Sequence, residues 1–164
     1  MKQYDKLKIS IVGAGSVSFC PGTLADILLS EPLNRLPLEI CLMDIDNFKN
    51  INDRYGHDVG DTVLKFIADV LRQNIRHTDL ACRWGGEEFL VVMRMCSLET
   101  GKKILEKIRN TVEQETVQTG SGCIRISITG GAMVLRDDNI KATIEDCDKK
   151  LYEGKHSGKN KIVI

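Results

Sequence analysis

The chain has 164 residues and a mass of 18.3 kDa, which is the size of one compact domain. Hydrophobic residues make up 42% and charged residues 28% of the sequence, and these globular proportions exclude a chain that is disordered throughout. Because 23 Lys and Arg residues balance 23 Asp and Glu residues, no overall basic charge favours binding to a nucleic acid polymer or to a membrane surface.

Neither a membrane segment nor a zinc site is expected. No uninterrupted apolar run reaches the roughly 20 residues of a membrane-spanning helix, and the turn residues within 9–20 argue against an export signal. The cysteines lack the spacing of zinc ligands. Cys41, Cys82 and Cys123 lie in apolar runs typical of buried strands, where a free cysteine packs as a small hydrophobic residue. A reducing, cytoplasmic location is the simplest interpretation.

The first part of the chain predicts a strand, a glycine turn and a helix. Residues 7–12 (LKISIV) form the strand, Gly13-Ala14-Gly15 the turn, and about 22–30 the helix. A short, bounded apolar run over 38–43 then predicts a buried strand that ends at Asp44-Ile45-Asp46.

Beyond residue 46, helical and strand patterns alternate. A helix is predicted over 58–76, and Ser97 is a suitable cap for a second helix over about 98–115, with Leu98 on its inner face. Gly85-Gly86 stand between two apolar runs, and because both glycines can take positive φ they predict a tight hairpin turn. The remaining elements are a strand with a glycine interruption over 123–134, a helix over about 140–153 that ends at Gly154, and a strand over 161–164.

This order of elements predicts an α/β fold, in the form of an α+β sandwich. A mixed, mainly antiparallel central sheet is flanked by helices, and an extra N-terminal strand and helix precede it. We place the boundary after residue 37, so that 1–37 form an atypical, Rossmann-like strand-turn-helix and 38–164 form the main domain.

Four carboxylates form the most informative group. Asp44 and Asp46 end a buried strand, on one face by its two-residue period, and Glu87 and Glu88 directly follow the glycine turn. If the hairpin packs beside the 38–45 strand, Glu87 comes near Asp44, and the two carboxylates can hold Mg²⁺ ions that complete their shells with water and phosphates. Taken alone, an Asp-x-Asp pair also suits acids that lie at strand ends in solvent.

Longer motifs add a family resemblance. Residues 42–61 (LMDIDNFKNINDRYGHDVGD), 76–89 (RHTDLACRWGGEEF) and the tail LYEGKHSGKNKIVI occur in the order and at the spacing of the GGDEF family of diguanylate cyclases, which 38–164 resemble. The resemblance implies a fold like the palm of nucleotidyl cyclases.

The resemblance also implies roles for single residues. Asn52 and Asp61 match the pair that reads guanine, and a carboxylate can indeed accept from both N1–H and the exocyclic amine of that base. Asp61 equally suits the first turn of a helix, and both roles can coexist. The residues that match the family's catalytic and Mg²⁺- or Mn²⁺-binding groups are Asp44, Ile45 through its carbonyl, Glu87 and, beside them, Glu88.

Basic residues supply candidate phosphate contacts. Phe48 and Lys49 open the loop after the strand, where backbone N–H groups can reach phosphate oxygens. Lys155 matches a phosphate-binding lysine, and Lys159 stands where the family usually has an arginine, so it keeps the charge but loses the bidentate fork. The Lys/His-rich tail also suits a solvated helix end. His57 resembles a structural residue of the family rather than a general base.

Arg76 and Asp79 form an Arg-x-x-Asp motif ahead of Gly85. This motif resembles the family's inhibitory site, where cyclic di-GMP binds away from the active centre and an arginine can fork to a guanine or phosphate. An exposed ion pair at a helix end explains the motif equally well.

The implied reaction joins two GTP into cyclic di-GMP and releases pyrophosphate. Each 3′-hydroxyl attacks the α-phosphate on the facing subunit with the help of metal ions, and because one site holds one GTP, a homodimer is needed. The alternative is a catalytically weak or inactive domain that binds cyclic di-GMP or GTP. Intact Asp44 and Glu87 argue against that alternative, whereas Lys159 and the unusual N-terminus argue for it.

Residues 1–46 carry a second resemblance, to the opening β-α-β of NAD-dependent glycosidases, as in a chimera. There Gly13, Gly15 and Ser16 would face a pyrophosphate and Asp44 a ribose. The turn lacks the third glycine of the fuller fingerprint, the rest of a Rossmann sheet is missing, and Asp44 cannot serve a ribose and a metal ion together. We therefore expect this segment to replace the family's usual leading helix rather than to bind NAD.

Overall fold

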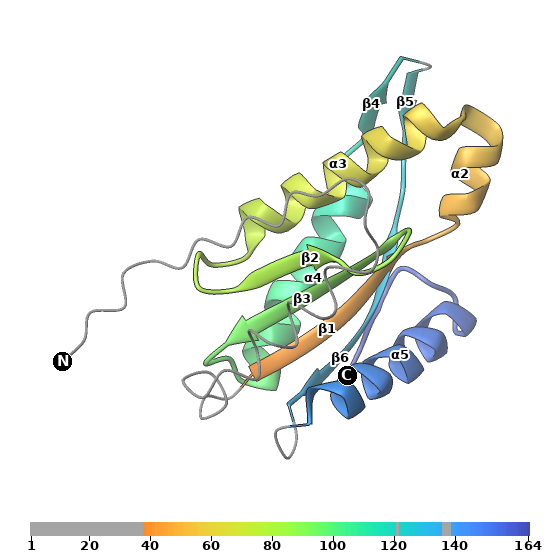
Figure 1. Ribbon diagram of the computed structural model, residues 1–164. Coiled ribbons are helices and arrows are strands. Elements are labelled where there is room, and N and C mark those ends of the chain that lie inside the picture. The colour runs from red at the N-terminus through yellow and green to blue at the C-terminus, as the bar shows by residue number, and fades with distance from the viewer. Residues whose placement is uncertain (1–37, 121, 136–138) are drawn as a thin grey trace.

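The computed structural model describes residues 38–120, 122–135 and 139–164. Figure 1 shows the path of the chain through these residues. The elements are β1 (Leu38–Ile45), α2 (Phe48–Tyr55), α3 (His57–Asn74), β2 (Leu80–Arg83), β3 (Glu88–Arg94), α4 (Leu98–Gln114), β4 (Val117–Thr119), β5 (Gly122–Ile124), β6 (Ile128–Val134), α5 (Ile140–His156) and β7 (Ile162–Val163).

β1 is the middle strand of a five-stranded sheet with the order β2-β3-β1-β6-β7. The β1–β3, β1–β6 and β2–β3 pairs are antiparallel, and β6 and β7 are parallel. The mixed, mainly antiparallel sheet predicted from the sequence is therefore confirmed. Every residue of β1 is buried, which explains why its sequence (LEICLMDI) is mostly apolar on both faces rather than alternating, with Glu39 and Asp44 as the exceptions.

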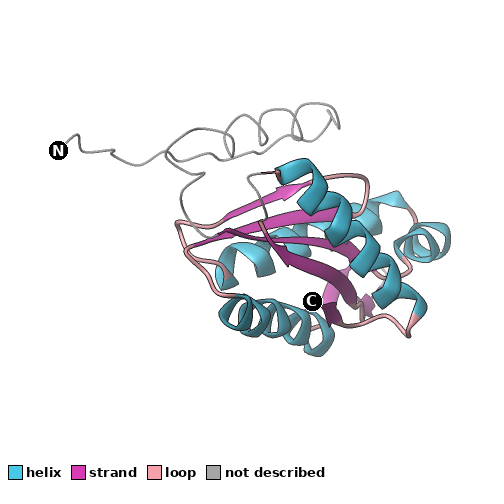
Figure 2. Cartoon of the chain, turned by 90° about the horizontal axis from the view of Figure 1, so that it is seen from below, coloured by secondary structure: helices cyan, strands magenta, loops and turns pink. Residues whose placement is uncertain are grey.

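Helices cover both faces of this sheet. In Figure 1 α5 lies in front of the sheet and α4 behind it, with α3 running along the upper side, and Figure 2 shows the magenta strands between cyan helices. Successive side chains of a strand point to opposite faces. Cys41 and Met43 accordingly join the core cluster of α3 and α4, whereas Ile40 and Leu42 join the cluster of α5.

A glycine in β6 permits a close approach of α5. A Cβ atom on Gly131 would overlap the carbonyl oxygen of Cys147 and lie 2.5 Å from the backbone nitrogen of Leu151. Since both neighbours are backbone atoms, α5 cannot pack this closely against any other residue type. The predicted glycine interruption is thus a packing site within a continuous strand.

Two predictions based on glycines are wrong. Neither Gly85 nor Gly86 has a positive φ. The hairpin closes through a wider loop in which Trp84 and Gly85 donate to the Glu88 carbonyl, at 2.8 and 3.3 Å. Gly154 does not end its helix, because α5 continues to His156 and Gly154 is buried inside it.

Four further expectations also need correction. Leu98, expected to face inward, is 38% exposed in the first turn of α4. Cys123 is exposed because it lies in a separate two-stranded sheet of β4 and β5, which interrupts the strand predicted over 123–134. The predicted loop at Phe48 and Lys49 is instead the first turn of α2. With only eight, mostly polar residues (FKNINDRY), this helix is too short for periodicity analysis to reveal it.

The predictions for residues 1–37, including the strand, the glycine turn with Gly13 and Gly15, and the helix over 22–30, lie outside the described residues. The proposed boundary after residue 37 stays a prediction. Within the described ranges, no helix has the length and apolar character needed to cross a bilayer.

Candidate functional site

The end of β1 meets the start of β3. Asp44 is paired with Glu88 across the antiparallel ladder, so their side chains share one face of the sheet with Cβ atoms about 5 Å apart. The Ile45 N–H donates to the Glu87 carbonyl at 3.3 Å. The hairpin therefore packs beside β1, and both glutamates come to its end. The direct cross-strand partner of Asp44 is Glu88, whereas Glu87 lines a separate pocket.

Asp44 is a buried carboxylate with only 8% of its surface exposed. Lys155 of α5 forms an ion pair with Asp44 Oδ1, and no other described residue donates a hydrogen bond to this oxygen. Burial raises the pKa of Asp44 to about 6, against the opposing effect of Lys155 and with further repulsion from Glu87 and Glu88. Asp44 is therefore a carboxylate that lacks full compensation for its charge.

This group of residues fits a hard divalent cation. The under-satisfied Asp44 oxygen and the neighbouring glutamates are the oxygen donors that Mg²⁺ and Mn²⁺ prefer. Within the described part of the chain, no three His, Cys, Asp or Glu side chains already form a ligand shell. Mg²⁺ commonly takes one or two carboxylates and fills its shell with water and phosphate oxygens. Asp44, Glu87 and the Ile45 carbonyl would hold such an ion.

A pocket of about 480 Å³ lies between α2, α3 and the β2–β3 loop. It brings together five residues that were predicted separately: Phe48, Lys49, Asn52, Asp61 and Glu87. His57 also lines it, together with Arg83, Asp53, Leu64 and Gly86. A polar pocket of this size that opens beside the carboxylates can accept a nucleotide base.

Two residues that shape this pocket were missed by the sequence analysis. A Cβ atom on Gly60 would overlap Asn52 Oδ1 and lie 3.2 Å from Phe48 Cζ, so only glycine lets α3 approach the Asn52 side chain. Arg83 Nε donates to the carbonyl oxygens of Gly85 and Gly86 at 3.1 and 3.0 Å and so holds the hairpin loop. A glycine at the start of a helix, as in Gly60-Asp61, is the signal that could have revealed the first contact.

The basic side of the site comes from α5 and the loop that follows it. Lys155 reaches Asp44 from the last turn of α5, and Lys159 Nζ donates to Asn47 Oδ1 at 2.5 Å. Asn47 begins α2 with a left-handed φ of 59°. Both predicted phosphate lysines therefore lie around the end of β1.

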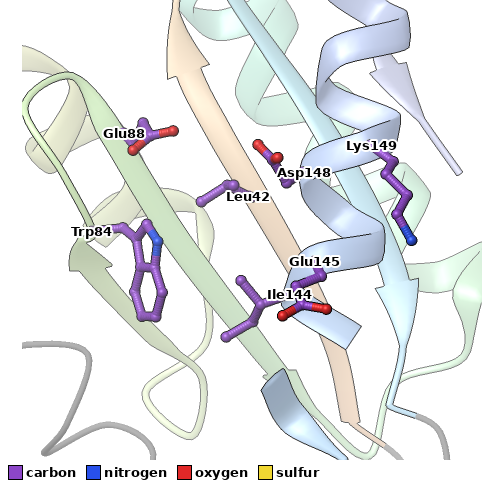
Figure 3. Close-up of a pocket in the computed structure, with 7 residues that line it drawn as sticks. All are labelled: Leu42, Trp84, Glu88, Ile144, Glu145, Asp148 and Lys149. Atoms are coloured by element: carbon purple, nitrogen blue, oxygen red, sulfur yellow. The ribbon is translucent and has the colours of Figure 1, made fainter. Parts of the chain in front are cut away.

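A second pocket of about 450 Å³ adjoins the site on the α5 face of the sheet (Figure 3). Its walls are Leu42, Trp84, Glu88, Ile144, Glu145, Asp148 and Lys149, and Glu88 and Asp148 point toward one another in Figure 3. Burial raises the pKa of Glu88, and the Asp148 carboxylate adds to this effect. The Glu88 carboxylate is therefore harder to ionise than an exposed glutamate.

Arg76 and Asp79 lie apart from this site, at the opposite end of the β2–β3 hairpin. Asp79 is buried, and its carboxylate accepts from the backbone N–H groups of Arg76 at 3.0 Å and Arg94 at 3.1 Å. The Asp79 side chain thus fixes the turn before β2. Gly13 and Gly15, the candidate NAD contacts, lie outside the described residues.

A family model described as "Diguanylate cyclase, GGDEF domain" matches residues 24–161. The chain belongs to the GGDEF family. The match begins before β1 and runs to the residue that precedes β7, so it includes every element that contributes to the site.

Relatives of this GGDEF domain include two curated bacterial proteins. Diguanylate cyclase A of Treponema denticola is 38% identical over 77% of this chain, and response regulator PleD of Caulobacter vibrioides is 36% identical over 93% of it. Each alignment covers 35% of the relative, so the chain spans about a third of the length of these proteins.

Solved structures show the same fold. The isolated GGDEF domain of PA1120 (TpbB or YfiN) from Pseudomonas aeruginosa superposes with a TM-score of 0.80 at 30% identity, covering 92% of this chain and 93% of that one. The GGDEF domain of DgcB from Caulobacter crescentus, solved in complex with c-di-GMP, has a TM-score of 0.76 at 26% identity, covering 85% and 83%. The palm-like fold expected from the sequence is thereby confirmed.

Proposed function

We propose that this GGDEF domain is a diguanylate cyclase, which joins two GTP molecules into cyclic di-GMP with a divalent metal ion and across a homodimer. The observation that carries the proposal is the buried Asp44 carboxylate, which lies beside Glu87 and Glu88 and has Lys155 as its ion-pair partner. Glu88 lines one of the two pockets and Glu87 the other. Several relatives bear the name diguanylate cyclase, which supports the same activity here.

The α2–α3 pocket would bind the guanine. Asn52 and Asp61 come from different helices and face one pocket, so together they can present an amide and a carboxylate to the base edge. A carboxylate accepts from N1–H and the exocyclic amine of guanine, whereas adenine offers no matching pair of donors. Lys155, Lys159 and Lys49 surround the end of β1 and would bind the phosphates.

In the proposed reaction, each 3′-hydroxyl oxygen forms a bond to the α-phosphorus of the facing GTP. The bond from that phosphorus to the α,β-bridging oxygen breaks, and pyrophosphate leaves. When bound, Mg²⁺ or Mn²⁺ lowers the hydroxyl pKa and neutralises charge that develops on the phosphate. Glu88, with its raised pKa, is suited to accept the hydroxyl proton.

A homodimer and a cytoplasmic location belong to the proposal. The described site offers one guanine pocket, so a cyclic product with two guanines needs two sites that face each other, as a two-fold dimer provides. Cys41, Cys96 and Cys147 are buried free thiols, which agrees with a reducing compartment.

Incubation of the purified chain with GTP and Mg²⁺ tests the proposal. We expect two pyrophosphates for each cyclic di-GMP, measured by a coupled phosphate assay and by chromatography. Glu87→Gln should abolish both products, whereas Glu99→Gln, which changes an exposed acid of α4, should retain them. If the folded parent chain forms no product at concentrations where it dimerises, the proposed enzymatic activity is refuted.

A weak or inactive domain that binds GTP or cyclic di-GMP is the second candidate. The ion pair between Lys155 and Asp44 favours it, because the ammonium competes with a metal ion for the carboxylate. Calorimetric titration with cyclic di-GMP, with Arg76→Ala as the comparison, distinguishes the two. Binding of cyclic di-GMP that depends on Arg76, without any turnover of GTP, would support the binding module.

A further inference from the structure

Asn160 joins the loop after α5 to two distant parts of the chain. Its backbone N–H donates to Asp46 Oδ2 at 3.0 Å. Its side-chain Oδ1 accepts from Arg109 Nη1 at 2.8 Å, and its Nδ2 donates to Glu113 Oε1 at 2.7 Å. The N–H and both side-chain polar atoms of one residue are therefore bonded to β1's end and to α4.

Asp46, the β1-side anchor, is a buried carboxylate whose bonds are fully used. Only 4% of its surface is exposed. Besides Asn160, it accepts from Ser127 Oγ at 2.7 Å and from Thr129 Oγ1 at 2.7 Å. Asp46 thus differs from Asp44, which keeps an under-satisfied oxygen, and it serves to hold neighbouring segments rather than to bind a ligand.

Arg109, the α4-side anchor, is held by its own helix. Its side chain is 14% exposed and forms ion pairs with Glu106 and Glu113, both at 2.8 Å. These pairs fix the guanidinium so that one Nη1 can serve Glu113 and Asn160 together. α4 lies on the opposite face of the sheet from α5 (Figure 1), so the network passes around the β7 edge.

The backbone conformation that this network holds is energetically unfavourable. Gly158, Lys159 and Asn160 have φ values of 110°, 60° and 49°. The left-handed region costs a lysine roughly 1 kcal/mol, while asparagine tolerates it better. Consecutive residues in this region persist only where the surrounding structure holds them.

The held loop places the Lys159 side chain at the site. Its Nζ donates to Asn47 Oδ1, and Asn47 directly precedes Phe48 and Lys49 of the guanine pocket. A shift of Asn160 would turn the adjacent Lys159 away from the end of β1. Hydrogen bonds from α4 to Asn160 and from Lys159 to Asn47, joined by the peptide bond between residues 159 and 160, therefore link α4 to the site.

We infer that Arg109, Glu113 and Asn160 are positioning residues that hold Lys159 against a phosphate of the bound nucleoside triphosphate. The inference rests on the proposed function for the identity of that phosphate. The hydrogen bonds that hold the loop do not depend on it.

Asn160→Gly in the full chain is the central variant, because glycine keeps the left-handed backbone accessible and removes only the side-chain bonds. We expect the KM for GTP to rise about tenfold with kcat nearly unchanged, as for a lost contact made equally in ground and transition states. Lys159→Ala should give a similar rise. The double variant should add little to either, because both changes remove one contact.

Arg109 and Glu113 lie on α4, on the opposite face of the sheet from α5 (Figure 1). Arg109→Ala and Glu113→Gln should nevertheless raise the KM for GTP as Asn160→Gly does. Glu99→Gln, which breaks the exposed Lys103–Glu99 pair of the same helix, is the matched control and should leave KM unchanged. A purely structural role would lower the unfolding midpoint without the shared dependence on Lys159. Additive effects of Asn160→Gly and Lys159→Ala would overturn the inference.

Hydrogen exchange separates this inference from the proposed function. The Lys159 N–H donates to the Gly154 carbonyl at 3.0 Å and should be protected in the parent chain without any nucleotide. We expect Asn160→Gly and Glu113→Gln to speed exchange at residues 159–161 at least fivefold, with α3 unaffected. Unchanged exchange there would refute the positioning role. A parent chain that neither binds nor converts GTP, with exchange altered as expected, would refute only the proposed substrate.

Discussion

The carboxylate of Glu39 on β1 lies against the backbone of Gly101 on α4, with no space between them for a Cβ atom on Gly101. Glu39 is wholly buried, and neither carboxylate oxygen has a hydrogen-bond partner among the described residues. Burying an unpaired carboxylate is unfavourable. This contact is therefore a weak point in the core.

Gly101→Ala should destabilise the domain by about 1 to 3 kcal/mol, because the new methyl group overlaps an enclosed side chain. In a Glu39→Ala background the same substitution should be neutral or stabilising, since alanine is favoured over glycine in helices by about 1 kcal/mol. Urea unfolding of the four chains measures both effects. An equal loss in the two backgrounds would contradict the contact.

Glu39 should also make stability depend on pH. Burial raises the pKa of Glu39 from 4.5 to about 7. Because the folded state then binds more protons than the unfolded chain between these values, the free energy of unfolding falls as pH rises through this window. Between pH 5 and pH 8 the loss should be about 2 to 3 kcal/mol.

Glu39→Gln has no proton to lose and should flatten this dependence, so its advantage over the parent should grow toward pH 8. Urea unfolding at both pH values provides the measurement, and Glu99→Gln on the exposed side of α4 provides the control. A parallel pH dependence of Glu39→Gln and the parent would show that another group is responsible.

Gly60→Ala should weaken GTP binding without touching the nucleotide. The new methyl group overlaps Asn52 Oδ1, so Asn52 must leave its place in the α2–α3 pocket. We expect the KM for GTP to rise about tenfold and discrimination against ATP to fall. Gly120→Ala, where a Cβ atom meets nothing within 4 Å, is the matched control. Unchanged kinetics in both variants would show that Asn52 does not bind the base.

Asp44→Asn should separate activity from stability. The carboxylate is buried and incompletely compensated, so the amide should leave the free energy of unfolding unchanged or raised. Pyrophosphate release should nevertheless fall about 100-fold or more, because the amide binds a divalent ion weakly. Chelation of the metal should reduce the parent to the same level. A parent that keeps its rate after chelation would rule out the metal-dependent mechanism.

The sequence correctly predicted those features that short-range patterns determine. The buried run of β1, the position of the hairpin after residue 80 and the Ser97 cap of α4 all follow from periodicity and local hydrogen bonding, and the structure confirms them. The sequence placed Asp44 at the end of one strand and the glutamates at the start of another, but the nearness of the two depended on the condition that the hairpin packs beside β1, which the structure meets.

Other features depend on contacts between residues far apart in the chain. The wider loop at Gly85 and Gly86 is held by the Arg83 side chain. Gly154 lies inside α5, where a Cβ atom would come within 2.7 Å of Thr129 Cγ2. No local sequence pattern predicts these long-range contacts, because a glycine in a turn and a glycine at a close packing contact look the same in the sequence. The sequence likewise indicates only that Asn160 is a loop residue, and the structure adds its hydrogen bond to Arg109.

The sequence by itself determined the family, the order of the longer helices and strands without α2, β4 and β5, and which acids and lysines are candidates for the chemistry. Those properties follow from motif spacing and from the periods of hydrophobic residues, which are local. Only the tertiary structure decided that Glu88 rather than Glu87 lies across from Asp44, that Asp46 is a structural anchor, and that α4 supports the Lys159 loop. Strand register and side-chain hydrogen bonds between distant segments fix these relationships, because burial leaves each polar group only the partners that the fold brings to it.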